Sequence, residues 1–121
     1  MANILIIEDN EQNLYLATFI LEKRGHTVRS ATDGAQGIQL AQETHPDLIL
    51  LDIQLPVMDG YAVADELRRN PALAGIPIVA VTSYAMAGDR ERILAAGCNG
   101  YIEKPINPET FMGEVEAHLK K

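Results

Sequence analysis

Residues 47–52 read Asp-Leu-Ile-Leu-Leu-Asp and give the clearest indication of the fold class. The four central residues are all apolar and lack the alternation of a half-exposed strand. A short apolar run of this kind is typical of a parallel strand that is covered on both faces. Because an unpaired charge is costly to bury, Asp52 at the end of the run marks a candidate site.

Strand and helix patterns alternate on either side of this stretch. The predicted strands are 4–7, 27–31, 48–51, 78–81 and 100–103. The predicted helices are 12–24, a segment from the Asp33 cap to about residue 43, 61–69, 87–96 and 108–119. Five such units predict one α/β domain over residues 1–121, a three-layer sandwich around a doubly wound parallel sheet. Right-handed crossovers and the common order 2-1-3-4-5 place the switch point between strands one and three.

Composition excludes several classes of protein. The formal net charge of −7 argues against nucleic acid as a partner, because such binding depends on lysine and arginine. No apolar run is long enough to span a bilayer, and the N-terminal run lacks the basic start of a secretory signal. We therefore expect a cytoplasmic protein with no membrane partner.

Other reactive or charged residues are expected to be structural. The single cysteine, Cys98, is predicted to be a small buried hydrophobe. The histidines match no zinc spacing and are expected at the surface or at helix ends: His26, His45 and His118. Two arginine-containing segments, 68–69 and 90–92, are interpreted as solvated helix faces.

Polar side chains follow four of the five predicted strands. They are Glu8 and Asp9 after the first, Asp52 after the third, Thr82 after the fourth and Lys104 after the fifth. In the expected order these four strands are neighbours, about 4.8 Å apart. The three carboxylates, the hydroxyl and the ammonium should therefore share one pocket at the carboxyl edge of the sheet.

The charges of this pocket predict a metal site. Clustered carboxylates repel one another, and a hard divalent cation removes the conflict. Mg²⁺ prefers oxygen ligands and keeps waters that an incoming phosphate can replace. Mn²⁺ accepts the same kind of ligands and is expected to substitute for it. Asp9 and Asp52 are the expected direct ligands, Glu8 binds directly or through water, and the backbone carbonyl of Gln54 completes the set.

An ionised aspartate beside Mg²⁺ can attack a phosphoryl group in line, which gives an aspartyl phosphate. The transition state spreads negative charge over the equatorial oxygens, so cations and hydrogen-bond donors stabilise it. Lys104 is placed to meet one oxygen as a compact point charge, and the Thr82 hydroxyl can donate to another.

Four stretches together resemble the receiver domain of two-component response regulators. They are 7–10 (Ile-Glu-Asp-Asn), 47–60, 79–82 (Val-Ala-Val-Thr) and 101–105 (Tyr-Ile-Glu-Lys-Pro). The resemblance implies that Asp52 is the phosphoacceptor, that Glu8 and Asp9 are the acidic pair, and that Lys104-Pro105 is cis. It also implies a phosphohistidine donor, either a sensor histidine kinase or a histidine phosphotransfer protein.

The resemblance further implies a switch. Phosphate on Asp52 draws the Thr82 hydroxyl inward, Tyr101 moves toward the core, and a downstream protein reads the surface formed by 87–96, 100–103 and 108–119. Gln54 and Tyr84 occupy positions that vary in this family and tune the phosphate lifetime. We hypothesise that the bulky Tyr84 slows dephosphorylation.

Each of these residues has a simpler interpretation when taken alone. Asp9-Asn10 and Asp59-Gly60 suit helix caps, and for Asp59 the cap is preferred. Thr82 suits a strand, Lys104 a loop and Tyr101 the core. The functional interpretation is favoured because the candidate residues fall on one edge of one sheet.

Other classes of protein fit less well. A haloacid-dehalogenase-like phosphatase would need a second carboxylate at position 54, where Gln54 stands. A nucleotide-binding module would need a glycine-rich loop after the first strand, where 8–11 reads Glu-Asp-Asn-Glu. A scaffold without phosphorylation would not need the acidic set. The receiver is not expected to be an enzyme on a separate substrate, and either a stand-alone regulator or a domain of a hybrid kinase fits, with the former favoured.

Overall fold

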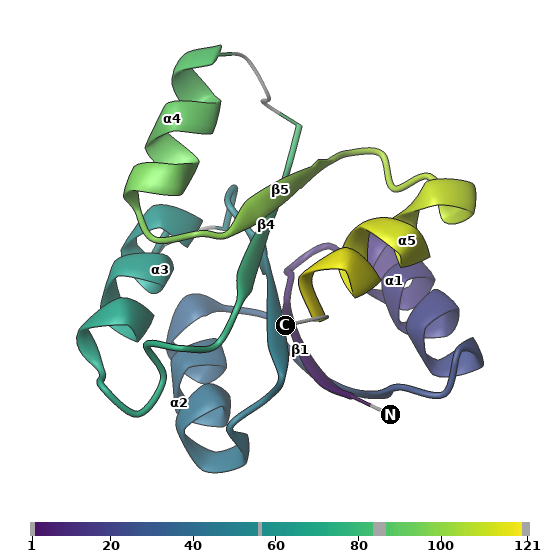
Figure 1. Ribbon diagram of the computed structural model, residues 1–121, viewed down its shortest axis with the longest axis horizontal. Coiled ribbons are helices and arrows are strands. Elements are labelled where there is room, and N and C mark those ends of the chain that lie inside the picture. Colours follow the sequence, from purple (N-terminus) through teal and green to yellow (C-terminus); the bar gives the residue numbers. More distant parts are fainter. Residues whose placement is uncertain (1, 56, 84–86, 120–121) are drawn as a thin grey trace.

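The computed structural model describes residues 2–55, 57–83 and 87–119. A parallel five-stranded sheet lies between two layers of helices, which confirms the predicted three-layer α/β fold (Figure 1). The strands run in the order β2-β1-β3-β4-β5. Their bounds are β1 (Asn3–Ile7), β2 (Thr27–Ala31), β3 (Leu48–Asp52), β4 (Ile78–Thr82) and β5 (Gly100–Glu103).

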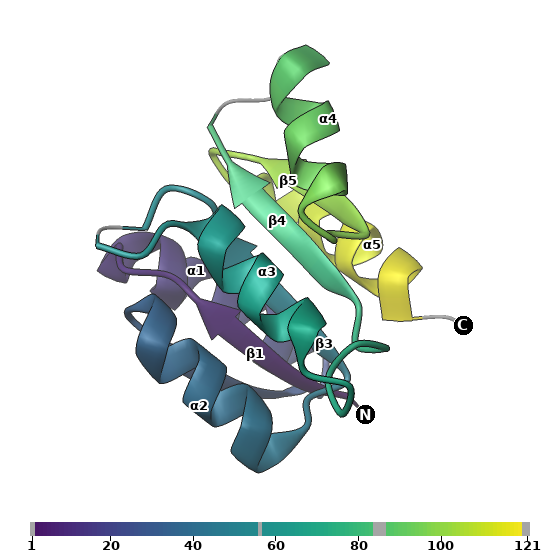
Figure 2. The same cartoon turned by 90° about the vertical axis from the view of Figure 1, so that its left-hand side faces the viewer.

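The helices begin and end within one residue of the predicted limits. They are α1 (Glu11–Lys23), α2 (Gly34–Thr44), α3 (Gly60–Arg69), α4 (Ala87–Ala95) and α5 (Pro108–Leu119). The side chains of Asn10, Asp33 and Asp59 cap α1, α2 and α3 by accepting from the N–H three residues later. Helices α1 and α5 cover one face of the sheet, and α2, α3 and α4 cover the other (Figures 1 and 2).

The buried central strands explain the unbroken apolar runs. Leu5, Ile49 and Leu51 belong to the core under α2, α3 and α4, whereas Ile4 and Leu50 belong to the core under α1 and α5. Successive side chains of a strand point to opposite faces, and here both faces are covered. Apolar residues are therefore needed at every position, and all five residues of β3 are buried.

The structure corrects two expectations about basic residues. His26 is buried, and its Nδ1 accepts from the backbone N–H of Ala2 at 3.2 Å. Arg68 is not a solvated helix residue, because its guanidinium donates to the carbonyls of Gly97 and Ile76 and to Oδ1 of Asn99 at 2.8–2.9 Å. Nothing in the sequence signals either role, since each depends on contacts with distant segments.

One other expectation holds. Cys98 is buried, as predicted. Within residues 2–55, 57–83 and 87–119, no helix has both the length and the apolar character to cross a membrane.

Candidate functional site

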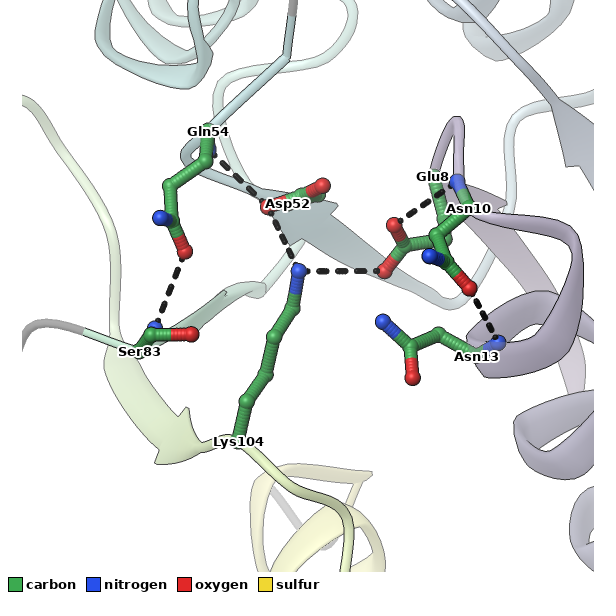
Figure 3. A network of polar contacts seen from close by, with 7 residues as sticks. All are labelled: Glu8, Asn10, Asn13, Asp52, Gln54, Ser83 and Lys104. Carbon is green, nitrogen blue, oxygen red and sulfur yellow. Dashed lines mark hydrogen bonds and ion pairs between the residues drawn. The ribbon is translucent and has the colours of Figure 1, made fainter.

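The carboxyl ends of the strands bring the predicted polar residues to one edge of the sheet. Glu8 and Asp9 follow β1, Asp52 ends β3, and Lys104 follows β5. Figure 3 shows the side chains of Glu8, Asp52 and Lys104 pointing toward one another. The Lys104 ammonium lies 3.2 Å from Oδ1 of Asp52 and 3.7 Å from Oε1 of Glu8. Residues far apart in the sequence thus converge on one charged cluster, as the strand order requires.

The acidic cluster has the composition of a site for a hard cation. One carboxylate oxygen each from Glu8, Asp9 and Asp52 lies within 4.8 Å of the others. Asp9 is exposed, while Asp52 is only 2% and Glu8 only 4% exposed. Because all three donors are carboxylate oxygens, the set suits Mg²⁺ rather than a softer metal.

Electrostatic strain in the cluster appears at Glu8. Burial, and after it the neighbouring Asp52 carboxyl, raises the pKa of Glu8 from 4.5 to about 7. The N–H of Asn10, which donates to Oε2 of Glu8 at 3.1 Å, and the Lys104 ammonium oppose this shift. The lysine therefore does not offset the effects of burial and of Asp52 on Glu8, and a cation bound to this carboxylate would favour its ionised form.

The loop after β3 is fixed against the end of the strand. Asp59 caps α3 through its side chain, as predicted, by accepting from the N–H of Ala62 at 3.0 Å. A Cβ on Gly60 would lie 2.5 Å from the Cα of Ile53 and 2.7 Å from the carbonyl oxygen of Asp52. Glycine at position 60 thus allows α3 to begin directly beside the backbone that carries Asp52.

Gln54 makes a contact that the sequence did not reveal. Its backbone N–H donates to Oδ1 of Asp52 at 2.9 Å, while its side-chain Oε1 accepts from the N–H of Ser83 at 3.0 Å (Figure 3). The second contact joins the loop after β3 to the end of β4. It links residues 29 positions apart, so no local pattern could have predicted it.

The predicted switch residues lie on the neighbouring strands β4 and β5. Thr82 ends β4 and is 1% exposed, and Ser83 after it borders the open pocket that Asp52 and Lys104 also line. Tyr101 on β5 is half-buried, and the guanidinium of Arg90 lies 5.5 Å above its ring. The predicted lifetime residue Tyr84 lies outside the described residues. The Lys104-Pro105 bond is cis, as expected.

This sheet and the polar cluster at its edge define a receiver domain, and the comparisons agree. Residues 4–116 match the response regulator receiver domain family, and the chain belongs to that family. The curated relatives include the polar-differentiation response regulator DivK of Brucella ovis, which is 42% identical over 117 residues, covering 97% of this chain and 95% of DivK.

Solved structures show the same fold. The chemotaxis protein CheY4 of Vibrio cholerae is 27% identical with a TM-score of 0.93, and the match covers 98% of each chain. The receiver domain of sensor histidine kinase PA1611 from Pseudomonas aeruginosa is 34% identical with a TM-score of 0.91, covering 99% of this chain and 98% of that one. That structure is described with a magnesium ion coordinated in its active site cleft.

Proposed function

We propose that this receiver domain accepts a phosphoryl group on Asp52 from a phosphohistidine of a sensor histidine kinase or histidine phosphotransfer protein. The observation that carries the proposal is the buried Asp52 carboxylate, which has Lys104 at 3.2 Å and two further carboxylates beside it. An oxygen of Asp52 forms the new bond to phosphorus as the phosphorus–nitrogen bond breaks. The leaving imidazole keeps the electron pair of that bond.

Mg²⁺ is the proposed cofactor, with Mn²⁺ as a substitute. Glu8, Asp9, Asp52 and the backbone carbonyl of Gln54 would hold it, and the all-oxygen carboxylate cluster supports this assignment. When bound, the metal neutralises charge on the phosphoryl oxygens.

The protein's own residues would stabilise the transferring group. Lys104 is proposed to pair with one phosphoryl oxygen, which it can reach because it already contacts the Asp52 carboxylate. The Thr82 hydroxyl is proposed to donate to another oxygen and, with Tyr101, to change the face formed by α4, β5 and α5. Phosphorylation would then shift an equilibrium between two forms of that face, which a downstream protein reads.

The proposal also covers the domain as a unit and the lifetime of the phosphoryl group. Residues 1–121 act as one cytoplasmic receiver unit, whose own phosphorylation and dephosphorylation are its only covalent chemistry. Gln54 and Tyr84 set the phosphate lifetime, and Tyr84→Ala is expected to speed dephosphorylation. An unchanged decay rate in that variant would remove Tyr84 from the proposal.

Intact-mass spectrometry after incubation with acetyl phosphate tests the central step. With Mg²⁺ the protein should gain about 80 Da, the mass of one phosphoryl group, and Asp52→Asn should gain nothing. Asp47→Asn is the matched control, because Asp47 precedes the other end of β3 and accepts from the N–H of Asn3 at 2.7 Å. If the wild type gains no mass from acetyl phosphate or from a phosphohistidine donor, the proposal fails.

A further inference from the structure

The side chain of Gln54 extends from the loop after β3 to the end of β4. Its Oε1 accepts from the backbone N–H of Ser83 at 3.0 Å, while its own backbone N–H donates to Asp52 (Figure 3). One residue therefore contacts both the carboxylate of the site and a backbone donor on the neighbouring strand end.

The N–H of Ser83 is a donor at the edge of the pocket. Ser83 lines the same pocket as Asp52 and Lys104, and it directly follows Thr82. A phosphoryl group on Asp52 would present three oxygens, and backbone N–H groups bind such oxyanions strongly because the acceptor is charged. Of the groups around this donor, the Gln54 amide is the one that the structure shows bonded to it.

We propose that the Gln54 side chain competes with the phosphoryl group for the N–H of Ser83 and thereby holds the site in its resting form. The inference rests on the proposed phosphorylation of Asp52 and adds a step to it. The Gln54 amide must leave Ser83 before the phosphoryl oxygen can accept from the same N–H.

Replacing the Gln54 amide oxygen by a phosphoryl oxygen at the N–H of Ser83 is favourable. A charged phosphoryl oxygen is a better acceptor than a neutral amide oxygen, so the N–H gains a stronger bond when the group arrives. Gln54 is only partly buried, and its released amide can bond to water. The bond between the Ser83 N–H and Gln54 must still be broken, and this lowers the affinity for the phosphoryl group. The cost is about one net hydrogen bond, which corresponds to about a two- to tenfold change in affinity.

Binding of beryllofluoride, a phosphoryl mimic, in the presence of Mg²⁺ tests the competition. Gln54→Leu removes the acceptor but keeps the backbone carbonyl, and it should bind the mimic about two- to tenfold more tightly than the wild type. Gln54→Ala is a second variant without the acceptor. Mg²⁺ titrated alone measures the metal affinity of each protein, and beryllofluoride affinities are then compared at a Mg²⁺ concentration that saturates wild type and variants alike.

Gln36→Leu is the matched control. Oε1 of Gln36 also accepts from a backbone N–H, that of Thr32 at 2.9 Å, but Gln36 does not line the pocket. Losing this bond should leave beryllofluoride affinity unchanged. Circular dichroism melts of each variant show whether the fold is retained.

Nuclear magnetic resonance of the Ser83 amide gives a direct readout. The Ser83 amide proton shift should differ between wild type and Gln54→Leu without the mimic and coincide once the mimic is bound. Equal or weaker affinity in both folded Gln54 variants would overturn the inference. If instead the wild type does not bind the mimic and gains no phosphoryl mass, the proposed function itself fails.

Discussion

The ammonium nitrogen of Lys104 lies 3.2 Å from Oδ1 of Asp52, so an ion pair joins the end of β5 to the end of β3 across the intervening strand β4. Among the described residues that line the pocket, Lys104 is the only cation. The carboxylates around it are those of Glu8, Asp9, Glu11 and Asp52. Lys104 therefore offsets much of the negative charge in this pocket, and its side chain is only 13% exposed.

Replacing Lys104 by methionine should therefore weaken the fold when no divalent cation is present. The variant leaves buried carboxylates without their cation, and the free energy of unfolding should fall by about 1–3 kcal/mol. Urea titrations with a chelator and with Mg²⁺ measure the effect, and added Mg²⁺ should restore most of the loss. Lys104→Arg keeps the charge and is the control. Equal stability of Lys104→Met and wild type in chelator would contradict this account.

Arg68 should contribute far more to stability than its neighbour Arg69. The Arg68 guanidinium donates to carbonyls of the loop before β4 and of Gly97. The ion pairs of Arg69 with Asp65 and Glu66 lie on its own helix and are exposed. We expect Arg68→Ala to cost about 2–3 kcal/mol and Arg69→Ala less than about 1 kcal/mol.

Arg68→Lys should recover only part of the loss, because an ammonium cannot reproduce the planar fork of donors. Chemical denaturation of the three variants measures these differences. Similar costs for Arg68→Ala and Arg69→Ala would show that the guanidinium contacts do not stabilise the fold.

Val57 carries backbone strain that a substitution should relieve. Its φ of 66° lies in the left-handed region, which is unfavourable for a β-branched side chain, and the side chain is fully exposed. Val57→Asn should raise the free energy of unfolding by about 1 kcal/mol, because asparagine tolerates this conformation. Val57→Thr is polar but remains β-branched and should give no gain. Thermal melts distinguish the two, and an equal gain in both would assign the effect to polarity.

The Cys98 thiol should be poorly reactive in the folded protein. Burial, opposed by the nearby Arg68, raises the pKa of Cys98 from 9.0 to about 11. At about pH 8 the folded protein should therefore react with iodoacetamide about a hundredfold more slowly than the denatured protein. Mass spectrometry of the alkylated protein gives the rates for the folded and the denatured state. Equal rates would contradict protection of the Cys98 thiol by burial.

The same shift predicts the direction of a pH effect on stability. Between about pH 9 and pH 11 the unfolded thiol ionises and the folded one does not, so the contribution of Cys98 to stability falls as pH rises through this range. Cys98→Ala removes the titrating group. The variant should lose less stability than the wild type over this interval in denaturant titrations.

Much of the fold could be predicted because local patterns and the global arrangement agree. Several element boundaries that the sequence predicts are present in the structure. They are the end of the buried run at Asp52, the helix caps at Asp33 and Asp59, and the helix end at Gly25. Gly25 follows α1 with φ of 97°, the left-handed conformation expected after a helix end. These features depend on neighbouring residues and therefore leave a signal in the sequence.

The strand and helix pattern and the family can be read from the amino-acid sequence, as can the strand ends that carry Glu8, Asp9, Asp52, Thr82 and Lys104. The parallel sheet then brings them together, because strand order and direction place those ends along one edge. Three features are visible only in the folded chain: Arg68 donates to the carbonyl of Gly97, His26 is buried, and Gln54 accepts from the N–H of Ser83. Such contacts join residues distant in sequence through one or two polar atoms, and their geometry exists only after the core has packed.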